Sequence, residues 1–264
     1  MVYRVDTFEE NKINPVTQNE WDDKWIVLIV TNNPVTKMIV GSENGCTYTM
    51  KVSKYADDNW FMAVGDAIGY CDNVGKNIIL VIDEIDFREM TGLYNNHCFN
   101  ESSLRDYEPK VLVHSTTMES YKNIQKEGKL KCWNRLKRER LLSEEFSIGS
   151  QLGDPEEFGD YIMFGSFGVS GEIVVSSRQA GFVNMDVNAE YETGARMYFD
   201  ARKLAEDGLL VRDGAHIKVK EELQLHKYLI WTATWEKVGL ENRISTPCAF
   251  AESSDSKFKE IFRN

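Results

Sequence analysis

Two apolar runs rich in β-branched residues, separated by one amphipathic segment, constrain the fold of the first third of the chain most strongly. The run Lys24–Val30 (KWIVLIV) stops at an Asn-Pro turn, and a second run begins at Ile78 (IILVID). Both have the length of strands and are apolar throughout, which is typical of strands buried on both faces. Between them, apolar residues spaced three and four apart over 60–71 predict a helix that ends near Gly75.

A hairpin completes this first unit. The segments Lys37–Val40 and Cys46–Val52 alternate polar and apolar residues around a turn near Asn44-Gly45. Residues 1–90 therefore read as β-β-β-α-β, a compact α+β arrangement. Residues 89–109 show no sustained period, and we place the linker there, which predicts one domain at 1–105 and a second at 106–264.

Charge and hydropathy narrow the class of protein. The formal net charge is −11, so the chain as a whole should repel polyanions and anionic membrane surfaces. Residues 1–22 contain no apolar run of signal-peptide length, and no stretch approaches the ~20 apolar residues that span a bilayer. We therefore expect a cytoplasmic protein with no membrane partner.

The sequence predicts no metal site. Its five cysteines are scattered and show neither CxxC nor a Cys/His spacing that would bind zinc, so we expect reduced thiols. The acidic cluster Asp83, Glu84 and Asp86 follows a predicted strand and could hold magnesium. Without a phosphate-binding glycine loop, a solvated strand end is the favoured interpretation.

The second half alternates short strands with short helices. A helix is expected at Thr117–Glu127, stopped by Gly128, and a strand that runs into a short helix is expected over 195–204. Strands are predicted at Lys110–His114, Tyr161–Phe164, Glu172–Val175, Leu209–Val211, His216–Val219 and Tyr228–Thr234. A last amphipathic stretch contains Phe258 and Ile261.

The segment Lys129 to Arg140 is the most basic part of the chain, with six Lys and Arg residues and Trp133 among them. Cationic and aromatic side chains together suit contact with a nucleic acid. A solvated surface whose basic residues pair with Glu139, Glu144 and Glu145 is the competing interpretation, and it is the favoured one.

Two segments carry a resemblance to a known family. The strand that ends in VHST (Val113–Thr116) is followed by the helix SYKNIQKEGKL, and FDARKLAEDGLLVRDGAHIKV spans Phe199–Val219. The closing segment 225–230 reads LHKYLI. This order resembles the ADP-ribosyltransferase-like fold over residues 110–232, nearest to its RNA 2'-phosphotransferase branch, and it implies a domain built from two small sheets.

The resemblance implies an NAD site and a role for each matching residue. His114 and Thr116 would hold the nicotinamide ribose and amide, and Ser115 stands where the family has glycine, so that its side chain is expected to crowd the dinucleotide. Arg178 would grip a phosphate, and Tyr161 would stack on nicotinamide. A surface arginine and a core tyrosine are the competing interpretations.

The acidic catalytic position of the mono-ADP-ribosyltransferases matches His216 here, with Glu221 and Glu222 nearby. The resemblance implies ADP-ribosyl transfer from NAD to a protein or nucleic-acid acceptor, or a 2'-phosphotransferase-like reaction on RNA. The departure at His216 leaves a second hypothesis open, namely an inactive binding module that keeps the fold. His114 itself has an ordinary alternative as a buried histidine bonded to a backbone carbonyl.

Overall fold

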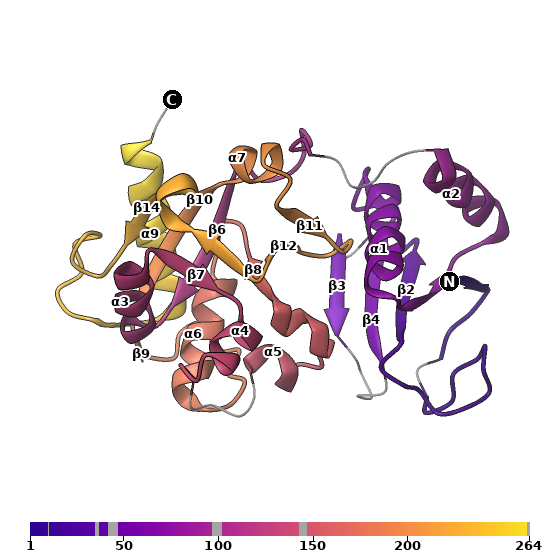
Figure 1. Cartoon of the computed structure of the whole chain (residues 1–264), viewed down its shortest axis with the longest axis horizontal. Helices are drawn as coiled ribbons and strands as arrows, with labels where there is room; N and C mark the ends of the chain where they lie inside the picture. The colour runs from indigo at the N-terminus through magenta and orange to yellow at the C-terminus, as the bar shows by residue number, and fades with distance from the viewer. Residues whose placement is uncertain (10, 35–36, 42–46, 97–101, 143–146, 263–264) are drawn as a thin grey trace. The chain divides into compact units, whose positions relative to one another are not determined.

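The chain is a mixed α and β protein that divides into two compact units (Figure 1). The structure, a computed structural model, describes residues 1–9, 11–34, 37–41, 47–96, 102–142 and 147–262. Unit 1 comprises Met1–Glu101 together with Leu152–Phe158 and Val211–Ile217, and unit 2 comprises the remaining residues from Ser102 onward. The predicted boundary after residue 105 lies close to this division.

Unit 1 is built on a five-stranded sheet of order β1-β5-β2-β4-β3. The four strands β1, β5, β2 and β4 run parallel, and β3 pairs antiparallel with β4, so the predicted hairpin pairing is confirmed. Its turn at Asn44-Gly45, with Cys46, lies outside the described residues. The strands are β1 (Val2–Val5), β2 (Trp25–Thr31), β3 (Met38–Gly41), β4 (Tyr48–Ser53) and β5 (Asn77–Val81).

Two helices accompany this sheet. The predicted helix is α1 (Trp60–Val74), which packs on the sheet and ends at Gly75 with a left-handed φ of 72°. Helix α2 (Glu84–Asn96) occupies the start of the predicted linker, so the expectation of irregular structure there is wrong. The carboxylate of Asp83 accepts a hydrogen bond from the Asp86 amide and begins this helix, which the weak apolar period did not indicate.

Unit 2 contains a central antiparallel sheet of order β14-β10-β6. A further sheet has the order β11-β12-β8, in which residues 211–212 of β11 and Ile217 of β12 are counted with unit 1, and an isolated bridge joins Val113 to Gly165. Short two-stranded pairs join β13 to β7 and β15 to β9. The strands are β6 (Val111–Thr116), β7 (Lys129–Lys131), β8 (Tyr161–Phe164), β9 (Tyr191–Glu192), β10 (Ala195–Asp200), β11 (Leu210–Arg212), β12 (Ile217–Lys220), β13 (Glu222–Gln224), β14 (Leu229–Ala233) and β15 (Ile244–Ser245).

Helix α3 (Met118–Glu127) forms where the sequence predicts it. The Thr117 hydroxyl accepts the Ser120 amide at its start, and Gly128 ends it with a φ of 67°. The remaining short helices are α4 (Trp133–Arg138), α5 (Ile148–Gln151), the 3-10 turn η1 (Glu156–Asp160), α7 (Ala201–Glu206) and α8 (Leu225–Tyr228).

Helix α6 (Ser170–Ala180) corrects one prediction. Residues Glu172–Val175 were expected to begin a strand because Ile173, Val174 and Val175 are β-branched. They are helical instead, and Gly181 ends the helix in the left-handed conformation. Tertiary packing overrides the local propensity, since Glu172 and Val175 are buried while Val174 is exposed.

The amphipathic tail is helix α9 (Pro247–Ile261), capped by the Thr246 hydroxyl. Phe258 is buried and stacks on Tyr198 of β10, with ring centroids 4.4 Å apart. The tail is therefore part of the core of unit 2. Among the described residues, no helix combines the length and apolar character needed to cross a membrane.

Candidate functional site

Strand β6 presents His114 and Ser115 to opposite sides. Successive side chains of a strand alternate, so Thr116 shares the side of His114. Nδ1 of His114 lies 3.1 Å from the carbonyl oxygen of Met163, the residue before Phe164 in β8. A carbonyl oxygen can only accept, so Nδ1 carries the proton and Nε2 is an acceptor. Nε2 of His114 is therefore able to accept a hydrogen bond but not to donate one.

The surroundings of His114 keep its imidazole neutral at pH 7. Burial lowers the pKa of His114, the bond to Met163 acts in the opposite direction, and the positive charge of Arg178 lowers it further. The ring also meets Phe164 edge-on, with centroids 6.0 Å apart. The bond to a backbone carbonyl matches the ordinary alternative for this histidine, and it also orients the ring.

Arg178, six residues after Glu172 on α6, lies within electrostatic range of His114. Its Nη1 is 3.5 Å from the Ser120 hydroxyl at the start of α3. Its guanidinium carbon lies 5.9 Å from the centroid of the Trp133 ring. A neutral histidine, a guanidinium, a hydroxyl and an indole thus occupy one neighbourhood.

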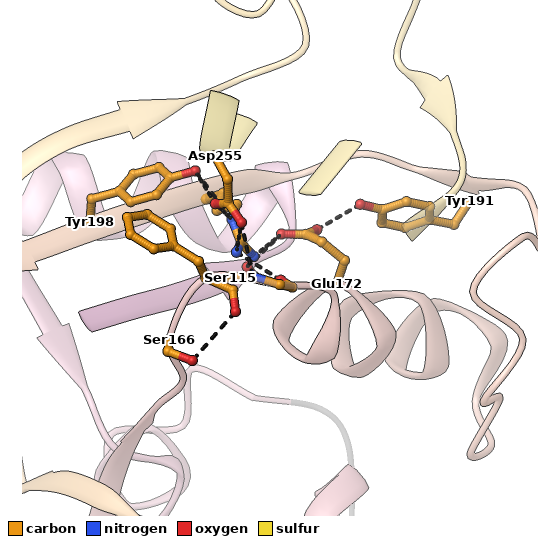
Figure 2. Close-up of polar contacts among 9 residues, drawn as sticks. Ser115, Ser166, Glu172, Tyr191, Tyr198 and Asp255 are labelled. Carbon is orange, nitrogen blue, oxygen red and sulfur yellow. Dashed lines mark hydrogen bonds and ion pairs between the residues drawn. The ribbon is translucent and has the colours of Figure 1, made fainter. Parts of the chain in front are cut away.

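The opposite side of β6 holds a buried network of charged and hydroxyl groups (Figure 2). The Ser115 hydroxyl donates to Glu172 at 2.5 Å, and the Tyr191 hydroxyl donates to the same carboxylate at 2.6 Å. Arg196 of β10 lies beside it, with Nη1 3.4 Å from Glu172. Burial raises the pKa of Glu172, and the charge of Arg196 offsets part of that rise.

Asp255 of α9 completes the network. Its carboxylate accepts from Nε of Arg196 at 2.9 Å and from the Tyr198 hydroxyl at 2.8 Å. It also accepts a hydrogen bond from the backbone amide of Gly168 at 2.8 Å, while Nη2 of Arg196 donates to the Gly168 carbonyl. Arg196 has no exposed surface and Glu172 only 1%, so these charges are compensated inside the protein.

Comparison with protein-family models, with curated proteins and with solved structures finds no match to this chain.

The predicted acidic residues Glu221 and Glu222 lie with the basic segment. Nη1 of Arg135 is 2.9 Å from Glu222, and Nζ of Lys129 is 3.0 Å from it. Arg138 lies 3.7 Å from Glu221. These contacts place both carboxylates in an ion-pair cluster formed by β7, α4, β13 and Glu221 directly before β13.

His216 belongs to unit 1, whereas the other predicted site residues belong to unit 2. Its amide and Nδ1 both contact the Asp213 carboxylate, at 2.7 and 3.3 Å. Its ring packs edge-on against Phe158, which also meets the rings of Tyr48 and Tyr70. This packing explains why Leu152–Phe158 and Val211–Ile217 group with unit 1.

Tyr161 is buried, with Nζ of the fully buried Lys218 lying 4.7 Å from its ring centroid. The contact is a cation–π arrangement within unit 2. This placement matches the interpretation of Tyr161 as a core residue.

The basic segment is largely paired with carboxylates. Lys131 contacts both Glu127 and Glu139, and Arg135 contacts Glu139 as well as Glu222. The predicted pairing with Glu139 is confirmed, whereas Glu144 and Glu145 lie outside the described residues.

In the acidic strand end of unit 1, Lys54 pairs with Asp83 and Asp86. Within the described ranges no group of three His, Cys, Asp or Glu side chains could hold a metal.

Sequence reasoning missed the buried network altogether. Its members come from β6, α6, β9, β10 and α9, up to 140 positions apart, and no local pattern links them. One signal was present, because Arg196 is a charged residue inside the apolar run ARMYF. An arginine at such a position requires buried acidic partners.

Proposed function

We propose that unit 2 binds NAD on the His114 side of β6 and transfers ADP-ribose to an acceptor. The observation that carries this proposal is the pairing of a neutral, oriented His114 with the cation of Arg178 in one neighbourhood. The order of β6, α3, β8 and α6, with two small three-stranded sheets, supports it through the resemblance to the ADP-ribosyltransferase-like fold.

Each residue has a role that follows from its chemistry. Nε2 of His114 accepts a hydrogen bond from a hydroxyl of the nicotinamide ribose. Thr116 lies on the same side of the strand. Arg178 offers its guanidinium to the pyrophosphate, for which a planar fork of N–H donors is suited. NAD supplies the reactive carbon, because the bond from ribose C1' to the nicotinamide nitrogen breaks as the acceptor attacks.

The contacts of the acidic residues favour an anionic acceptor. Glu221 and Glu222 are ion-paired with Lys129, Arg135 and Arg138, so both carboxylates are engaged as counter-ions. A phosphate oxygen attacks C1' without giving up a proton and therefore needs no general base. An RNA 2'-phosphate is the acceptor that suits this arrangement, and the basic segment Lys129 to Arg140 is its proposed contact.

Nicotinamide release from labelled NAD tests the proposal. We expect release by the native protein to depend on RNA that carries an internal 2'-phosphate, and to fall in Arg178→Gln by at least about tenfold. Arg202→Gln is the matched control, because Arg202 is an exposed arginine on the short helix α7. Release that is equal in all three proteins, or absent with every acceptor, would contradict the transferase.

A binding module that has lost catalysis is the second candidate. The departure at the acidic catalytic position favours it, since His216 stands there and both Glu221 and Glu222 are engaged in ion pairs. This candidate predicts NAD binding without nicotinamide release. The nicotinamide-release assay, combined with a measurement of NAD binding, therefore distinguishes the two functions.

A further inference from the structure

The contact between β6 and the first turn of α6 is unusually close. A Cβ atom at Gly171 would lie 2.8 Å from the Ser115 hydroxyl oxygen and 3.2 Å from its Cβ. Real side chains essentially never approach so closely, so only glycine fits there without displacing the helix or the serine. Because the Ser115 hydroxyl donates to Glu172 at 2.5 Å, the helix is both packed and hydrogen-bonded to the strand.

Glu172 is itself anchored from other elements. Tyr191 donates to it from β9, and Arg196 lies against it from β10, itself held by Asp255 of α9. The first turn of α6 is therefore fixed to β6 on one side and to the core on the other. Rotation or translation of the helix would break several buried polar contacts at once, which makes the arrangement rigid.

The same helix carries Arg178. Six residues separate it from Glu172, a distance of about 9 Å along the helix axis. A helix of this length moves as a stiff rod, so a shift at its first turn is passed on to Arg178. His114 moves together with Ser115, since the two are consecutive residues of the same strand.

We infer that Ser115 and Gly171 are positioning residues, which set the spacing between His114 and Arg178 by fixing α6 against β6. This inference rests on the proposed function for its consequence in NAD binding. It also gives Ser115 a different role, because its side chain was expected to crowd the dinucleotide. Its hydroxyl lies on the other side of the strand and ties it to the helix.

The imidazole of His114 reports this spacing without any ligand. Titration of labelled histidine by NMR should give a higher His114 pKa in Gly171→Ala than in the native protein, because the variant moves the cation of Arg178 away. Arg178→Gln should raise the pKa in the same direction. Adding Gly171→Ala to Arg178→Gln should then raise it little further, since both changes act through one charge.

Two further variants, Gly69→Ala and Ser115→Ala, distinguish a change in spacing from a general loss of folding. Alanine is favoured over glycine inside a helix, so Gly171→Ala should fold, and Gly69→Ala in α1 is the matched control because its new Cβ meets only Tyr94, at 3.8 Å. Ser115→Ala removes only the hydroxyl and leaves Glu172 its contacts with Tyr191 and Arg196. It should weaken NAD binding about five- to tenfold.

The outcomes separate the inference from the proposed function. A lower melting temperature in Gly171→Ala and Ser115→Ala, with an unchanged His114 pKa and unchanged NAD affinity, would overturn the inference and leave a purely structural contact. A raised His114 pKa in Gly171→Ala, with no NAD binding by the native protein, would support the positioning and defeat the proposed function. Native binding that weakens in Gly171→Ala but not in Gly69→Ala supports both.

Discussion

Two clusters of charged residues in unit 2 use the same chemical groups in different environments. In the buried network, Arg196 lies between Glu172 and Asp255 with no exposed surface. In the exposed cluster, Arg135 lies between Glu139 and Glu222 at the surface. Water can replace a lost partner in the second cluster but not in the first. Burial, rather than the number of ion pairs, therefore decides which cluster holds the domain together.

The largest expected effect is at Arg196. Replacing it with leucine leaves Glu172 and Asp255 buried without their cation, and the free energy of unfolding should fall by about 3–5 kcal/mol. Denaturant unfolding measures this change. Neutralising both carboxylates in the same chain, with Glu172→Gln and Asp255→Asn, should recover part of the loss. A loss in Arg196→Leu no larger than that of an ordinary surface substitution, about 0.5 kcal/mol, would show that the network is dispensable for stability.

A smaller loss is expected from Tyr191→Phe. This change removes one hydrogen bond to the buried Glu172 carboxylate, which keeps Ser115 and Arg196 as partners. The free energy of unfolding should fall by about 1.5–3 kcal/mol, the range for a bond to a charged group. An unchanged value in denaturant unfolding would mean that water replaces the hydroxyl.

His114 should make stability depend on pH. Its folded pKa is lowered from 6.5, so the unfolded chain binds the proton first as pH falls. Stability should therefore be lost below about pH 6.5, by at most about 1.4 kcal/mol per pH unit. Urea unfolding at pH 7.5 and 5.5 measures this loss, which His114→Gln should lack. The same pH dependence in both proteins would contradict a buried neutral imidazole.

The smallest effect is expected in the exposed cluster. Arg135→Ala should leave the unfolding midpoint within experimental error, because solvent screens the charges of Glu139 and Glu222. Thermal unfolding at low and high salt tests this expectation. A loss comparable to that of Arg196→Leu would erase the distinction between the two clusters.

The sequence predicted elements whose signals are local. Thr117 and Gly128 mark the ends of α3, and the apolar spacing over 60–71 marks α1, because caps and periodicity act within a few residues. Only the segment Glu172–Val175 of helix α6 was predicted as the start of a strand, since its β-branched residues outweigh any helix signal. The packing of Glu172 against Arg196 decides that segment, and no neighbour in the sequence reveals it.

The candidate site shows the same division. His114 and Thr116 were selected by their order before a helix, which resembles that of a nucleotide-binding fold, and their role in binding NAD stays a prediction. The acidic residues could not be placed, because the ion pairs of Glu221 and Glu222 with α4 depend on how distant segments pack. The location of His216 in unit 1 follows from its contact with Phe158, which is equally non-local.

Calorimetric titration of NAD into three proteins tests the central claim most directly. The native protein should bind, and His114→Ala should bind about five- to 150-fold more weakly, which corresponds to the loss of one ribose hydrogen bond of roughly 1–3 kcal/mol. His216→Ala is the control, since His216 belongs to unit 1, and it should match the native protein. Equal affinity in the native protein and His114→Ala, or no binding by the native protein, would contradict the assignment of the NAD site to this side of β6.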